Sequence, residues 1–238
     1  MKKLATFGIG VLLIALVSWA GDDPWKSKDF HQWNENDTLV ILNQSPFSKL
    51  ITITKSWRAG DTTAASGQMP GQVGGLSPTL PGEHSPSADT GQYSFRVAWY
   101  SSHTVRAAVA RLEQLHHAKS DADAEKMFSP KMEDYIVLVQ GADMGPFNKR
   151  PEKDFQGLAY LQLKKSKERI SPSKVEYLRG SDGAVNSVLF YFPHKNAAGE
   201  PTISPDEKGV NFVCPFEKTA IQNYFEPQKM VAKDGQDM

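Results

Sequence analysis

Cysteine is almost absent from the sequence, which has only Cys214 among its 238 residues. One thiol cannot form an internal disulfide, so the fold must rely on its hydrophobic core. In the segment "GVNFVCPF", Cys214 alternates with Val210 and Phe212, which predicts one buried face of a strand. An intermolecular bridge or a reactive thiol is the alternative, although no basic cluster nearby favours a thiolate.

The motifs of several enzyme classes are also missing. There is no G-x-S-x-G, no H-E-x-x-H, no phosphate loop and no dinucleotide fingerprint, and the six histidines lack zinc-finger spacing. The sequence therefore offers no catalytic residue, no metal ligand and no cofactor site. Paired carboxylates on distant strands leave no recognisable spacing, so a hydrolase assembled in that way stays open as an alternative.

Neither sign of charge is in excess, because 27 Lys and Arg residues balance 27 Asp and Glu residues. Loss of Lys2 and Lys3 with a signal peptide would leave 25 against 27, a formal charge of −2. A nearly neutral, mixed surface gives no electrostatic reason to expect nucleic acid or an anionic membrane as a partner.

Long apolar runs are limited to residues 4–20, which follow Lys2 and Lys3. This run is shorter than the about 20 residues that a membrane span needs. The positive charges, the short apolar segment and the small residues at its end indicate a secretory signal peptide at residues 1–20. We expect cleavage after Ala20, export to the periplasm or beyond, and no stable membrane insertion of the mature chain. A retained N-terminal anchor is the alternative.

Residues 59–92 contain almost no large apolar side chains and are rich in Gly, Pro, Ser and Thr. Such a segment cannot bury enough surface to offset its ordering entropy, so we predict that it is disordered. The flanking segments "KLITITKSW" and "YSFRVAWY" alternate apolar and polar residues as strands do. They indicate a hairpin with a long tip, inside a single domain formed by residues 21–58 and 93–230.

Helical periodicity appears in three places. An apolar stripe predicts an amphipathic helix and is formed by Val105, Ala108, Val109, Leu112 and Leu115. A short helix is expected at residues 121–128, and another one follows Asn34. The rest of the chain is strand-rich, and no long helix separates its strands. The expected fold is therefore α+β, a mainly antiparallel sheet with two or three helices on one face and a frayed tail at residues 231–238.

The stretch "WNENDTLVILNQSPFSKL" has a capping residue, Asn34, and an acid three positions later, Asp37. This spacing predicts an acidic variant of the capping box at the start of a helix. Ser45 precedes a proline and so must leave the helical region, which predicts the end of the helix. Every conspicuous residue of the stretch thus has a structural explanation.

The chain resembles a family of exported bacterial proteins whose function is uncharacterised. The N-terminal part of the resemblance consists of Trp33, Asn34, Asp37, Ile41, Leu42, Ser45, Pro46 and Phe47. A variable Gly-rich insert and a strand that runs into an Arg/Ala helix follow, and the matching positions there are Arg96, Trp99, Ser101, Arg106, Ala107 and Arg111. Phe47 stands where the family is expected to have Trp. The resemblance implies a shared fold and export, and it implies no activity.

The candidate ligand-binding residues lie around the turn "YSSHT" between a strand and the amphipathic helix. Hydroxyl groups and free helix N–H groups near Ser101 and His103, helped by Arg106, could hold an anion. Capping of the helix is the structural alternative for the same residues. Trp57 and Trp99 could form an aromatic platform, for which burial in the core is the structural alternative.

These observations favour an exported, non-catalytic module that binds a partner or contributes to the cell envelope. Its partner would be a protein, a small molecule or a glycan. The alternative is an extracytoplasmic hydrolase, which would need several titratable groups with perturbed pKa values in one pocket.

Overall fold

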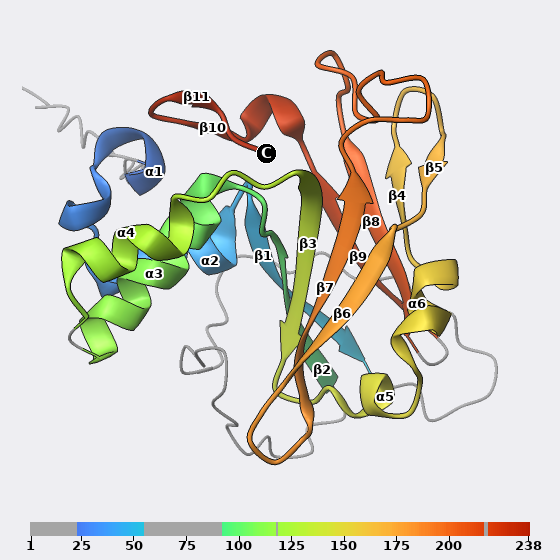
Figure 1. Ribbon diagram of the computed structural model, residues 1–238, viewed down its shortest axis with the longest axis horizontal. Helices are drawn as coiled ribbons and strands as arrows, with labels where there is room; N and C mark the ends of the chain where they lie inside the picture. The colour runs from blue at the N-terminus through green and yellow to red at the C-terminus, as the bar shows by residue number, and fades with distance from the viewer. Residues whose placement is uncertain (1–22, 55–91, 118, 217–218) are drawn as a thin grey trace, which may run out of the picture.

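The computed structural model describes residues 23–54, 92–117, 119–216 and 219–238. It confirms the α+β class, and every strand pair in it is antiparallel (Figure 1). The predicted signal peptide lies outside the described residues. So does the predicted disordered insert, apart from Gln92.

The α-helices are α1 (Pro24–Ser27), α2 (Glu35–Gln44), α3 (His103–His117), α4 (Asp121–Phe128), α5 (Gly145–Asn148) and α6 (Glu152–Leu158). Short 3-10 turns are η1 (Phe30–Gln32) and η2 (Pro227–Lys229). The strands are β1 (Ser48–Thr54), β2 (Gln92–Trp99), β3 (Asp134–Gly141), β4 (Tyr160–Leu163), β5 (Arg169–Ile170), β6 (Lys174–Arg179), β7 (Val185–Pro193), β8 (Val210–Phe216), β9 (Thr219–Phe225), β10 (Val231–Ala232) and β11 (Gly235–Gln236).

The larger sheet has the strand order β1-β2-β3-β7-β6. Its strands β1 and β2 pair from Ser48 opposite Ala98 to Thr54 opposite Gln92, which confirms the hairpin expected around the insert. Strand β3 lies at the centre of the sheet. Its sequence "DYIVLVQG" is apolar on both faces, as expected for a strand covered on both sides.

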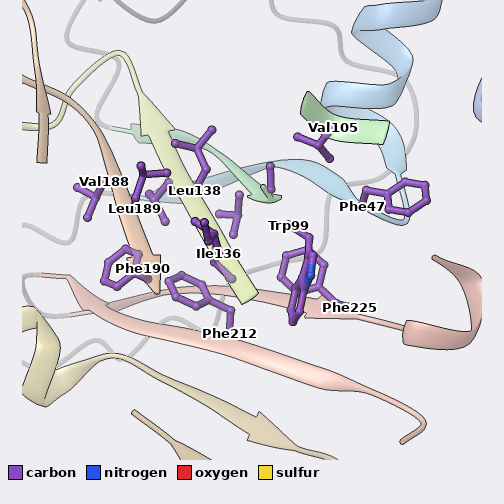
Figure 2. Packing of buried hydrophobic residues seen from close by; sticks show 14 of the residues in the cluster. Phe47, Trp99, Val105, Ile136, Leu138, Val188, Leu189, Phe190, Phe212 and Phe225 are labelled. Atoms are coloured by element: carbon purple, nitrogen blue, oxygen red, sulfur yellow. The ribbon is translucent and has the colours of Figure 1, made fainter. Parts of the chain in front are cut away.

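A second sheet, β5-β4-β8-β9, packs against one face of the larger sheet. Phe190 of β7 meets Phe212 of β8 at a ring-centroid distance of 5.2 Å. The two sheets are also joined by a hydrogen bond from Asn223 Nδ2 to the carbonyl oxygen of Val97, at 3.4 Å. Figure 2 shows these aromatic rings on the side of β3 that faces the second sheet. The division into two sheets was not expected from the sequence.

Helices α2 and α3 cover part of the opposite face of the larger sheet, as the apolar stripe of α3 predicts. Val105 of α3 is fully buried against this face, and Leu138 of β3 is nearly fully buried. Both side chains lie on the side of β3 that faces away from the second sheet (Figure 2). The short helices α5 and α6, which the sequence reading missed, contact β7, β6 and β8 instead. No helix in the described ranges is long and apolar enough to cross a lipid bilayer.

The N-terminus of α2 has the predicted capping box. Asp37 N donates to Asn34 Oδ1 at 2.9 Å, and Asn34 N donates to Asp37 Oδ2 at 3.0 Å. The helix ends at Gln44, and Ser45 has extended backbone angles, as expected for a residue before proline. Its hydroxyl donates to the carbonyl oxygen of Ile41 at 2.6 Å, which satisfies a free carbonyl group at the helix end.

The C-terminal residues differ from the frayed tail expected at residues 231–238. Strands β10 and β11 form a small hairpin, in which Val231 pairs with Gln236. Lys233 N donates to the carbonyl oxygen of Trp25, and Asp237 N donates to that of Met230 at 3.0 Å. These bonds attach the tail to the rest of the domain.

Candidate functional site

Trp99, for which an aromatic platform and burial in the core were the two alternatives, is fully buried. Its ring contacts Phe225 at a centroid distance of 5.0 Å and Tyr135 at 5.5 Å. It lies between the two sheets, so its side chain belongs to the core (Figure 2). Trp57, the other member of the expected platform, lies outside the described residues.

The hydroxyl groups before α3 have structural partners. Ser101 Oγ accepts a hydrogen bond from Ile136 N at 3.2 Å, which links the turn to β3. Ser102 Oγ accepts from Val105 N at 3.3 Å and so takes one free N–H group of the helix. Both serines are buried.

The N-terminus of α3 does hold an anion, and that anion is the side chain of Asp237. Its carboxylate accepts hydrogen bonds from His103 N at 2.7 Å, Thr104 N at 2.7 Å and Ser102 Oγ at 2.8 Å. The positive end of the helix dipole favours a negative charge in this position. The Asp237 carboxylate therefore caps the helix, the structural alternative for this turn, and it occupies the position that an anionic ligand would need.

Arg106 points away from this anion position. Its guanidinium donates hydrogen bonds to the carbonyl oxygens of Phe128 and Pro130, at and just beyond the C-terminus of α4. The ring of His103 meets Phe128 edge-on at 4.9 Å. Residues 101–106 thus join α3 to β3, α4 and the C-terminal tail, and the candidate ligand contacts are used inside the fold.

A pocket lies elsewhere, between α3 and the face of the larger sheet that the second sheet leaves free. It encloses about 540 Å³ of empty space, including the part open to solvent. Its described lining is formed by Leu42, Arg96, Ala98, Tyr100, Val105, Val109, Leu112, Leu138, Gln140, Leu178, Ser187 and Leu189. We call it the helix–sheet pocket.

The strand register explains the floor of the helix–sheet pocket. One row of residues across β2, β3 and β7 is apolar and consists of Ala98, Leu138 and Leu189. The neighbouring row, two residues away on each strand, is polar and consists of Arg96, Gln140 and Ser187. Because side chains two residues apart share a face, both rows belong to the pocket. The wall consists of Val105, Val109 and Leu112 of α3, so the pocket is apolar with polar groups along one side.

Arg96 is the only cation among the described lining residues. Its Nε and Nη2 donate to Asn43 Oδ1, each at 3.1 Å, and its Nη1 donates to Gln140 Oε1 at 3.0 Å. Both acceptors are neutral amides. Within the described residues no carboxylate forms an ion pair with Arg96, so its charge is not compensated there.

Burial affects both titratable side chains of the pocket lining. It lowers the pKa of Arg96 to about 10, so the guanidinium remains protonated at neutral pH. It raises the pKa of Tyr100, an effect opposed by the charge of Arg106, and Tyr100 remains neutral. The described lining of the pocket therefore has one positive charge in otherwise neutral, mostly aliphatic surroundings.

The described residues contain no group of three His, Cys, Asp or Glu side chains that could hold a metal ion. Cys214 is fully buried, and burial raises the pKa of its thiol, which fits the buried position predicted from its strand. His194 is partly buried and its ring meets Tyr135 at 3.9 Å. These groups lie outside the described lining of the helix–sheet pocket.

The sequence reading did not predict the helix–sheet pocket. From the sequence, Arg96 was assigned to one face of its strand and to the family resemblance, and it was given no role in binding. A signal was present nonetheless, because Arg96 alternates with the apolar residues Phe95 and Val97 in a strand expected to carry a helix on one face. A cation at such a position indicates that a charged side chain lies between the sheet and the helix that covers it.

Comparisons with protein-family models, with curated proteins and with solved structures give no match for this chain. A function must therefore be inferred from the residues of the pocket.

Proposed function

We infer that the protein is an exported, non-catalytic binding module that takes a ligand with an apolar body into the helix–sheet pocket. The observation that carries this proposal is the pocket itself, whose walls come from α3 and from four strands of the larger sheet. Concave, mostly apolar pockets with few polar groups are typical of small-molecule sites.

The composition of the lining favours binding over hydrolysis. Among the described lining residues there is no carboxylate, histidine, cysteine or lysine, and the titratable groups are Arg96 and Tyr100. General acid–base catalysis usually needs a group with a pKa near the working pH. A hydrolase built from distant strands is the second candidate of the sequence reading, and this lining gives it no support.

We expect the unaltered chain to bind 1-decanol, used as a neutral aliphatic probe, and we expect Val109→Trp to weaken that binding about tenfold or more. Val109 lines the pocket on α3, so the larger side chain would occupy the ligand's volume. Isothermal titration calorimetry measures both affinities.

Leu115→Trp is the matched control for this experiment. Leu115 lies on the same helix with 42% of its surface exposed, and it does not line the pocket. The Leu115→Trp variant should bind 1-decanol with the same affinity as the unaltered chain. Equal loss in both variants, or no binding by the unaltered chain, would contradict the proposal. Cleavage of a decanoyl ester that is lost in Val109→Trp would instead support the hydrolase.

Export is the other part of the proposal, and it rests on the charged and apolar residues 1–20 and on the family resemblance. We expect the protein recovered from a secreting bacterial host to begin at Gly21. Mass spectrometry of the intact purified protein measures this directly. A chain that still begins at Met1 would show that the segment is not a cleaved signal peptide.

A further inference from the structure

Arg96 has hydrogen-bonding capacity that the described residues do not use. A guanidinium carries five N–H donors. Three of them are used, one on Nε, one on Nη1 and one on Nη2, and their acceptors are the amide oxygens of Asn43 and Gln140. One N–H on each terminal nitrogen therefore has no acceptor among the described residues.

Among the described residues, the charge of Arg96 also has no partner of opposite sign. A cation held in low-dielectric surroundings is costly unless it is paired, because it has lost its hydration. Asn43 and Gln140 provide dipoles and no countercharge. An anion in the helix–sheet pocket would supply both the missing charge and the missing acceptors.

The rest of the lining indicates what the anion would be attached to. Apart from the polar row, the described lining is aliphatic with one aromatic residue, Tyr100. Leu138 and Leu189 form the floor beside Arg96, and Val105 and Val109 form the wall above them. Such a surface suits a flexible hydrocarbon chain, which gains free energy for each methylene group that leaves water.

We propose that the helix–sheet pocket binds an alkyl carboxylate, with the carboxylate on Arg96 and the chain along the apolar row. The two free N–H groups can donate hydrogen bonds to one or both carboxylate oxygens, an arrangement that suits the planar guanidinium. Asn43 and Gln140 hold the guanidinium in place, so little side-chain freedom is lost on binding. This inference rests on the proposed function, and it specifies the ligand class.

The test compares decanoate with 1-decanol by isothermal titration calorimetry at about pH 8, where carboxylic acids are ionised. The mature chain should bind decanoate about tenfold or more tightly than 1-decanol, because a hydrogen-bonded charge pair adds to the same apolar contact. Arg96→Gln should remove this preference while the affinity for 1-decanol changes less than about threefold. Arg96→Lys keeps the positive charge but loses the planar guanidinium that can bind both carboxylate oxygens, so it should retain part of the preference for decanoate.

Arg169→Gln is the matched control, because Arg169 is an exposed arginine of the second sheet outside the pocket. It should leave the preference for decanoate unchanged. Thermal unfolding of each variant establishes that it folds, and the comparison of the two ligands on the unaltered chain needs no variant. Equal affinity for both ligands, or a preference that survives in Arg96→Gln, overturns the assignment of a carboxylate to Arg96 and leaves the proposed binding function standing. Binding of neither ligand overturns both.

Discussion

Replacing Trp99 by alanine is expected to lower the free energy of unfolding by about 3–5 kcal/mol, the usual cost of removing a large buried aromatic side chain. Trp99 is fully buried and contacts rings from both sides, Tyr135 of β3 and Phe225 of β9. The substitution would leave a cavity between the two sheets, and the paired strands on either side cannot easily shift to fill it. Chemical denaturation of the purified protein measures the change.

Trp99→Phe distinguishes packing from hydrogen bonding in this experiment. The indole Nε1 has no hydrogen-bond partner in the described structure, so phenylalanine removes no such bond. We expect it to cost less than half as much as alanine, because the ring contact with Phe225 is largely kept. A loss below about 1 kcal/mol in Trp99→Ala would contradict the role of Trp99 in the core and return it to the candidate ligand contacts.

Asp237→Ala is expected to cost about 2 kcal/mol of unfolding free energy, which is large for a residue in a short terminal hairpin. Its carboxylate accepts three hydrogen bonds at the N-terminus of α3, two from backbone N–H groups and one from Ser102. In the variant these three donors lose their acceptor and must bind water instead. The variant also removes a negative charge that the N-terminus of the helix dipole favours. Chemical denaturation again measures the change.

Asp234→Ala is the control for Asp237→Ala, because it makes the same change of side chain in the same hairpin. Asp234 is exposed, and its substitution should change the unfolding free energy by less than about 0.5 kcal/mol. If the two variants have equal effects, net charge or hairpin propensity explains the loss, and the cap at α3 does not.

Local signals explain which parts of the fold could be predicted from the sequence. The capping box of Asn34 and Asp37, the serine before proline and the apolar stripe of α3 each involve residues within one or two turns of one another. The β1–β2 pairing was also predicted, because alternation marks both strands on either side of the insert. In these segments the local sequence favours one backbone conformation, so the structure can be predicted without knowing the distant contacts.

Pairings between distant segments explain what could not be predicted. Strand β4 pairs with β8, and β3 with β7, so strands that follow one another in the chain are divided between two sheets. Alternation shows that a strand has a buried face, and it does not show which other strand covers that face. The helix–sheet pocket has the same origin, since its lining comes together only through the register of β2, β3 and β7 with α3 above them.

The turn before α3 also shows that local sequence does not reveal contacts with distant residues. For the residues around Ser101 and His103, the sequence left two alternatives, capping of α3 and binding of an anion, and a carboxylate of the chain caps the helix. Local sequence could not show that the anion is Asp237, which lies 134 positions after His103. It also could not show that Arg106 turns toward the end of α4 instead.

The Asp237 cap sets a time order on folding during synthesis. A chain is made from its N-terminus, and domains fold as their residues become available. Helix α3 emerges while Asp237, 134 residues further along, is still to be added, and β2 likewise waits for Asn223, 126 residues after Val97. A partly made chain therefore contains α3 without its cap and β2 without the sheet that packs against it. Asn223 and Asp237 complete the contacts of β2 and α3 only after both elements have been made.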